Sequence, residues 1–157
     1  MYNYLTYRLV DPPFSLSQST IGWIFILYLL GTVSSNTMRF VRKRIGDSST
    51  LVLNILFMLL GILLTLWDHL FLVILGVGIF TFGFFGSHST ASSLVGIRAE
   101  AHKAHASSLY LLFYYMGSSI VGAGGGWFWS NYTWWGIGGL LISLQGLALL
   151  LVWFTVR

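Results

Sequence analysis

The sequence predicts an all-α fold, in which several helices cross a membrane as a polytopic helical bundle. Hydrophobic residues make up 56% of the 157 residues and charged residues only 8%, whereas roughly a quarter of the residues in a soluble domain are charged. The charges gather between uncharged runs of about 20 residues, the length that a helix needs to cross the hydrocarbon core of a bilayer. Because this core offers the backbone no hydrogen-bond partners, such runs are held helical.

The first 20 residues predict the tail of a helix, a loop and the start of the next helix. The Pro12-Pro13 pair stops the first helix, and Ser17, Ser19 or Thr20 is placed to cap the second. We expect no signal peptide here, because the segment lacks a basic start and polar residues interrupt its apolar part.

Five apolar segments follow and predict the membrane spans. Their approximate bounds are residues 21–38, 50–67, 70–92, 106–127 and 135–156. The fourth and fifth are joined by a turn at residues 130–133, and the tryptophans and tyrosine around this turn are typical of a membrane surface. The sequence predicts a single domain over residues 1–157.

Two connections between the spans carry most of the cations. The first holds Arg39, Arg42, Lys43 and Arg44, and the second, between the third and fourth spans, holds two more. Cationic connections face the cytoplasm in membrane proteins. The sequence therefore predicts a multi-pass protein of the cell membrane, with both connections and the C-terminus in the cytoplasm and the other turns outside.

The fourth span carries the most distinctive pattern. Ser118, Gly122 and Gly126 fall four residues apart, a spacing of small residues that lets a neighbouring helix pack closely in a bilayer. Tyr110 and Tyr114 form a second face with two hydroxyl groups. This face has two interpretations: the tyrosines bond to neighbouring helices or anchor the span at the interface, or they line a substrate path.

Few residues in the spans can carry chemistry. His88 is the one ionisable side chain well inside a predicted span, which makes it a functional candidate, although a neutral histidine bonded to a nearby hydroxyl or backbone group is the alternative. No cysteine, paired carboxylates or phosphate-binding motif is present. We therefore expect no enzyme, catalytic residue, metal or cofactor. The net charge of +4 lies between the spans, so we expect no nucleic-acid partner.

A family resemblance is carried by three segments, FGFFGSHSTASSLVG, ASSLYLLFYYMGSS and GGGWFW. They resemble the tenth and eleventh helices of the major facilitator superfamily, in its arabinose-efflux-permease-like branch and most of all in its YnfM-like inner-membrane transport proteins. DPPFSLSQSTIGWIFILYLLGTVSS is similar to the eighth helix and the loop before it. The family also carries a loop motif of the type G-x-L-a-D-R-x-G-R-R. Arg44 and Gly46 match this motif, whereas Arg39 and Lys43 replace its glycine and its aspartate.

The resemblance implies one half of a twelve-helix transporter that binds substrate between its two halves. The chain would be a truncated C-terminal half, with the end of helix seven and helices eight to twelve, from a split gene or a fragmentary gene model. It implies a proton-coupled efflux permease or antiporter of the bacterial inner membrane for small organic solutes, either sugars or drugs, that is inactive without the N-terminal half. Its partners would be the lipid bilayer, that half, the solute and protons.

Site residues also follow from the resemblance. Tyr110, Tyr114, Phe84 and His88 are expected in the wall of the substrate cavity, because helices seven, eight, ten and eleven of this half face the cavity in the family. Helices nine and twelve face lipid there, and the matching residues 51–66 and 140–154 are nearly all aliphatic. The alternative is a small membrane-embedded interaction or accessory protein with the same spans and no cavity.

Cysteines placed at Ser48 and at Asn131 test the topology. Ser48 lies in the first cationic connection and Asn131 in the turn between the fourth and fifth spans. An impermeant thiol reagent added to intact cells should label the cysteine at Asn131 and leave the one at Ser48 protected, because the cationic connections face the cytoplasm. The reverse labelling pattern would overturn the predicted orientation.

Overall fold

The computed structural model describes residues 1–155 and confirms the fold class, since this part of the chain holds helices and no strand. In chain order the elements are α1 (Tyr2–Val10), α2 (Gln18–Ile24), the 3₁₀ helix η1 (Phe25–Leu29), α3 (Leu30–Leu64), α4 (Leu70–Arg98), the 3₁₀ helix η2 (Glu100–His102) and α5 (Lys103–Thr155). The last residue of the predicted fifth span and the C-terminal residue, Val156 and Arg157, lie outside the described residues.

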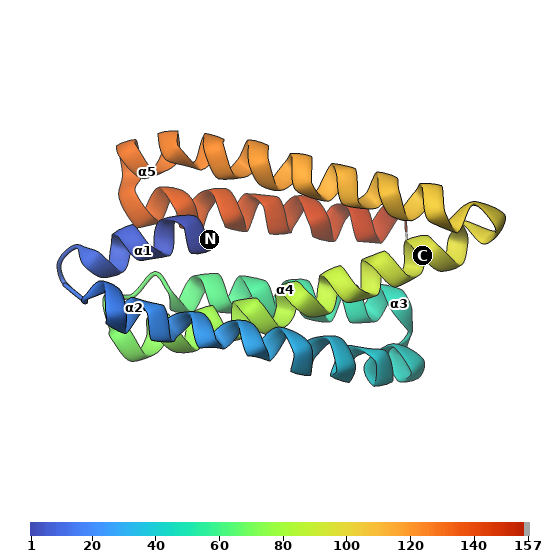
Figure 1. Cartoon of the computed structure of the whole chain (residues 1–157), viewed down its shortest axis with the longest axis horizontal. Helices are drawn as coiled ribbons and strands as arrows, with labels where there is room; N and C mark the ends of the chain where they lie inside the picture. The colour runs from blue at the N-terminus through green and yellow to red at the C-terminus, as the bar shows by residue number, and fades with distance from the viewer. Residues whose placement is uncertain (156–157) are drawn as a thin grey trace.

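Three continuous helical stretches within residues 1–155 are long and apolar enough to cross a membrane. They are Gln18–Leu64, Leu70–Arg98 and Glu100–Thr155. The first and the third are helical hairpins, each reversed at one residue with a positive φ: Gly46 (φ 81°) in α3 and Thr133 (φ 52°) in α5. The two limbs of each hairpin run side by side along the bundle (Figure 1).

Both hairpin turns are tighter than the sequence predicts. Arg39 to Arg44 were expected in a loop, but they lie on the first limb of α3, and Gly46 alone breaks the helix. The turn expected over residues 130–133 reduces to Thr133. The reason lies partly in Gly136, where a Cβ would meet the backbone carbonyl of Phe128, so only a glycine lets the second limb of α5 start this close to the first.

The loop between α1 and α2 follows the prediction. α1 ends at Val10, just before the two prolines. Ser17 is the N-cap of α2, and its hydroxyl accepts a hydrogen bond of 3.2 Å from the backbone N–H of Thr20. This satisfies one of the amide groups that the first turn of a helix leaves without a partner.

The closest helix packing joins the second limb of α3 to α4 through glycines. A Cβ on Gly61 would lie 2.6 Å from the Gly76 carbonyl oxygen, and a Cβ on Gly76 would lie 2.6 Å from that of Gly61. A Cβ on Gly83 would lie 2.5 Å from the Asn54 carbonyl oxygen. Helices in lipid associate by this kind of close backbone approach. α3 and α4 therefore form one tightly packed unit.

The packing face predicted on the fourth span has a different partner. Gly125 is the buried glycine there, and a Cβ on it would lie 2.8 Å from the Tyr4 ring of α1. The Tyr4 hydroxyl also donates a hydrogen bond of 2.6 Å to the Gly122 carbonyl. Ser118 is exposed, and a Cβ on Gly126 would only touch the Tyr4 hydroxyl, at 3.6 Å. The small residues of α5 thus pack against Tyr4 of the short helix α1, and not against a second long helix.

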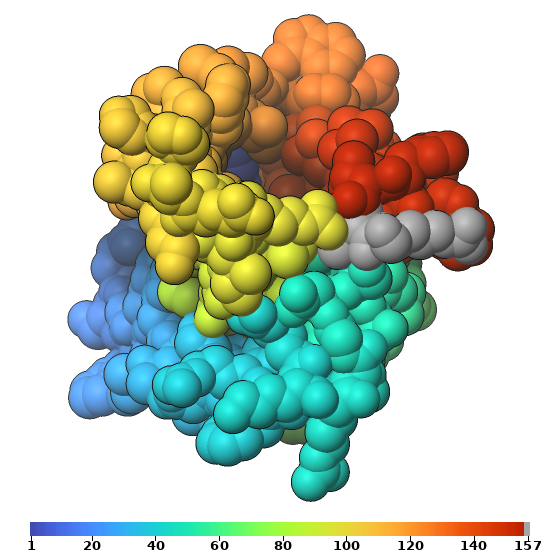
Figure 2. All heavy atoms as spheres, turned by 90° about the vertical axis from the view of Figure 1, so that its right-hand side faces the viewer, coloured from blue at the N-terminus to red at the C-terminus, as the bar shows by residue number. Residues whose placement is uncertain are grey.

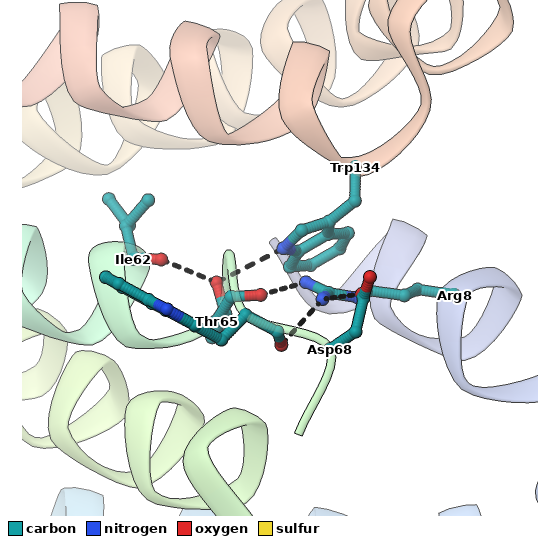
Figure 3. Close-up of polar contacts among 6 residues, drawn as sticks. Arg8, Ile62, Thr65, Asp68 and Trp134 are labelled. Carbon is teal, nitrogen blue, oxygen red and sulfur yellow. Dashed lines mark hydrogen bonds and ion pairs between the residues drawn. The ribbon is translucent and has the colours of Figure 1, made fainter. Parts of the chain in front are cut away.

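A buried arginine joins three parts of the chain at one end of the bundle. The guanidinium of Arg8, which is 6% exposed, donates to the carbonyl of Thr65, and at 3.0 Å to that of Trp67. It also pairs with Asp68 at 3.1 Å and lies 4.9 Å from the ring centre of Trp134. Figure 3 shows that Arg8 comes from α1, Thr65 and Asp68 from the α3–α4 connection, and Trp134 from α5.

The side chain of Thr65 adds two further hydrogen bonds to this group of residues. Its hydroxyl accepts from the Trp134 indole N–H at 3.2 Å and donates to the Ile62 carbonyl at 2.7 Å. Burial lowers the pKa of Arg8 from its usual value, while the hydrogen bond and charge of Asp68 raise it. A guanidinium stays charged through such shifts. We call Arg8, Thr65, Asp68 and Trp134 the arginine cluster.

Gly76→Ala should destabilise the bundle, because the new methyl group would press on the backbone of α3. Overpacking of this kind typically costs about 1–3 kcal/mol. The matched control is Gly124→Ala, since no atom lies within 4 Å of a Cβ there. Thermal denaturation of the purified chain in detergent, followed by circular dichroism, should show a lower midpoint for the first variant only. Equal midpoints would contradict the close approach of α3 and α4.

Arg8→Met should lower the stability by about 2–3 kcal/mol, because it leaves buried carbonyl groups of the α3–α4 connection without a donor. The exposed Asp68 end of the ion pair contributes little to this figure. Arg44→Met, at an exposed position, is the control. The same denaturation assay measures the difference. If the two variants melt together, the arginine cluster does not hold the bundle.

Candidate functional site

A cavity of about 480 Å³ lies between α4 and the two limbs of α5, next to α1. Its wall includes Tyr28 from η1, Phe84 and His88 from α4, Tyr114 from the first limb of α5 and Gln145 from the second. Figure 2 shows a hollow between the yellow-orange first limb and the red second limb, with blue N-terminal atoms at its bottom. The cavity is thus open at the end of the bundle that carries the α4–α5 connection.

The four residues predicted for the cavity wall lie together. Phe84 and His88 are one turn apart on α4, and Tyr110 and Tyr114 are one turn apart on α5. Residues four apart share a helix face. The pair on α4 and the pair on α5 therefore face each other. We call these four residues the aromatic–histidine cluster.

Contacts within the cluster are close. Nδ1 of His88 lies 2.9 Å from the Tyr110 hydroxyl oxygen, and the His88 ring centre lies 4.7 Å from that of Tyr114. The Phe84 and His88 rings are nearly parallel, 10° apart, with centres separated by 6.3 Å. Phe84, His88 and Tyr114 line the cavity, whereas Tyr110, predicted for the same wall, does not line it and is hydrogen-bonded to the imidazole.

The cluster combines three chemical properties. The ring faces of Phe84 and Tyr114 offer apolar and stacking contacts of the kind that aromatic pairs make. The imidazole of His88 can bind and release a proton. No Lys, Arg, Asp or Glu side chain is present among the described residues that line the cavity.

Several wall residues were not predicted from the sequence. Tyr2 of α1 shares a hydrogen bond of 2.6 Å with the Thr81 hydroxyl, and its ring stacks on Tyr28 with centres 4.4 Å apart. Gln145 lies in the fifth predicted span, and its buried Oε1 atom has no hydrogen-bond partner among residues 1–155. The sequence signal for this position is that Gln145 is the one glutamine in a run, residues 140–154, that is nearly all aliphatic.

The second limb of α5 has two faces, although the sequence predicted lipid contact for all of it. Leu140, Leu141 and Gln145 lie in the cavity wall. Leu147 and Leu151, 54% exposed each, do face outward. The expectation is therefore wrong for the inner face, which an aliphatic composition cannot distinguish from the outer one.

The other predicted site residues lie elsewhere. Ser118 and Gly122 also line the cavity. Arg39, Lys43 and Gly46 lie at the turn of α3 and line a separate pocket. Arg44, on the same limb, is exposed and lines neither.

Comparison with known proteins identifies several relatives named as transporters. An MFS-type transporter of Bacillus subtilis (strain 168), YybF, is 45% identical over 157 residues, which are 100% of this chain and 39% of the relative. A transporter of Buchnera aphidicola subsp. Schizaphis graminum (strain Sg) is 46% identical over 151 residues, 96% of this chain and 37% of the relative. The inner membrane transport protein YnfM of Escherichia coli (strain K12) is 42% identical over 150 residues, 96% of this chain and 36% of the relative.

The chain spans somewhat less than two fifths of the length of each of these curated relatives. No family model matches the chain, and no solved structure matches it significantly.

Proposed function

Because this chain belongs to the major facilitator superfamily of transporters, we propose that it supplies one wall of the substrate path in a secondary transporter. The transporter is a proton-coupled efflux permease of the bacterial inner membrane, and its substrates are small organic solutes, either sugars or drugs. The chain acts together with an N-terminal half. The observation that carries the proposal is the aromatic–histidine cluster beside an open cavity.

The cavity wall supports a preference for uncharged, partly apolar solutes. A volume of about 480 Å³ lies within the range of small-molecule sites, roughly 300–1,000 Å³. A charged substrate would find no Lys, Arg, Asp or Glu side chain on the described wall to pair with, and it would lose its hydration. An aromatic or sugar ring, in contrast, can stack on Tyr114 and Phe84. The result is broad selectivity, with the hydroxyl and amide groups of the wall setting the orientation.

His88 is the residue that best supports proton coupling. It is the one side chain of the described cavity wall whose usual pKa lies near neutral pH. Its Nδ1 atom is held by the Tyr110 hydroxyl, so the ring orientation is fixed while the other nitrogen can exchange a proton. Its ring also contacts the Tyr114 ring, so a change in its charge would be felt where the solute binds.

Restored transport tests the proposal. The chain would be co-expressed with the N-terminal half of an MFS-type relative, and export of sugars and of lipophilic compounds would be measured with and without a proton gradient. Tyr110→Phe removes only the hydroxyl that holds His88, and should lower gradient-driven export on the order of tenfold, as the loss of a hydrogen bond to an ionisable group does. Tyr114→Ala should weaken solute binding about 3- to 10-fold through lost stacking.

Phe113→Ala is the matched control, since Phe113 lies on the same limb, is 62% exposed and does not line the cavity. It should leave export unchanged. If export is restored and survives Tyr114→Ala combined with His88→Ala, the assignment of the cavity wall fails. If no N-terminal half restores export, and the chain still cross-links to a second membrane protein, the interaction-protein alternative replaces transport.

A further inference from the structure

A second pocket lies at the turn of α3, apart from the aromatic cavity. It has a volume of about 540 Å³ and opens between the first limb of α3 and the end of α4. One wall carries Arg39, Arg42 and Lys43, and the other carries Ser89 and Ser93. We call it the basic pocket. The cyan segment that contains its cations forms the lower part of the end seen in Figure 2.

The basic pocket carries an excess of positive charge. Arg39, Arg42 and Lys43 share one face of the helix, because they are spaced by three and four residues. The one carboxylate in the wall, Asp47, is taken by Arg42, with Nε and Oδ1 2.6 Å apart. Arg39 and Lys43 are exposed and form no ion pair within residues 1–155. Two cations are therefore available to an anion.

Neutral groups of the wall suit an oxygen-rich anion. Ser89 and Ser93 lie one turn apart on α4, and their hydroxyls can donate hydrogen bonds to it. Gly46 adds open space, since no atom lies within 4 Å of the position that a Cβ would take. Arginine and lysine with hydroxyl donors form the usual set of groups that binds a phosphate.

Chain length places the basic pocket at the membrane surface. The apolar run that starts at Ile21 reaches Arg39 after about 27 Å, at 1.5 Å per helical residue, and the run from Leu70 reaches Ser89 after about 28 Å. Both lengths match the hydrocarbon core, which is about 30 Å thick. Two independent helices thus bring their pocket residues to the level of the lipid headgroups.

Exposed apolar side chains lie beside the cations. Phe40, next to Arg39, is 68% exposed, and Ile45 is 47% exposed. In water these side chains would be unfavourable, whereas at a membrane surface they contact the upper part of the acyl chains. Free phosphate would gain nothing from them. A lipid gains contacts from the cations and from the apolar residues together.

We propose that the basic pocket binds the phosphate of an anionic phospholipid headgroup. The site does not depend on transport, since it shares no residue with the aromatic cavity. Each Lys or Arg near an anionic surface strengthens binding about fivefold.

Native mass spectrometry of the full chain, released from nanodiscs that hold equal amounts of phosphatidylglycerol and phosphatidylcholine, tests the proposal. The wild-type chain should retain phosphatidylglycerol in preference. R39Q combined with K43Q should reduce this preference on the order of tenfold or more, and S89A combined with S93A by a smaller factor. R39K combined with K43R keeps the charge and should keep the preference, which shows that a loss is not caused by misfolding.

R44Q combined with K103Q is the matched control, because it removes two cations that do not line the basic pocket. Its effect should be small, as expected for screened surface charges. An equal loss in both neutralised pairs would mean general attraction to the anionic membrane, and would overturn the proposal. Displacement of phosphatidylglycerol by excess inorganic phosphate would assign the site to free phosphate and would overturn it as well.

Discussion

The arrangement of the bundle depends on the buried guanidinium of Arg8. It donates to backbone carbonyls of the α3–α4 connection and lies against the ring of Trp134, at the point where α5 reverses. A buried charge is tolerated only where hydrogen bonds replace its hydration. The positions of α1, of the α3–α4 connection and of the α5 turn are therefore coupled, since moving any one of them would leave this charge without partners.

The cavity exists because the two halves of this bundle pack differently. The second limb of α3 meets α4 through Gly61, Gly76 and Gly83 with the two backbones in contact, which leaves no room between these two segments. α5 instead meets α4 through large rings, as between Tyr114 and His88. Rings hold two helices further apart than glycines do, so space remains along α5. The space is open at the end of the bundle that carries the α4–α5 connection (Figure 2).

Much of this could be predicted from the sequence, for identifiable reasons. Charge and length alone determine where a helix can cross a bilayer, so the fold class was accessible. The one-turn spacings of Phe84 with His88 and of Tyr110 with Tyr114 placed each pair on a face, although only the structure shows that the faces meet. Glycine spacing was less informative, because glycines occur in every predicted span and the pattern does not identify the helix that packs against them. The structural role of Arg8 could likewise not be predicted, because Arg8 donates to backbone carbonyls, which every residue possesses.

α4 connects the aromatic cavity to the basic pocket. His88 faces the cavity and the next residue, Ser89, faces the basic pocket, as adjacent helical residues point about 100° apart. Rotation of α4 alone is blocked, since a Cβ at Gly86 would already meet the Asn54 side chain and one at Gly83 the α3 backbone. Motion of α4 relative to α5 that keeps these contacts would therefore carry the second limb of α3 with it. The contact that must then change is the one between His88 and the tyrosines of α5, which is also the contact that lies at the cavity wall.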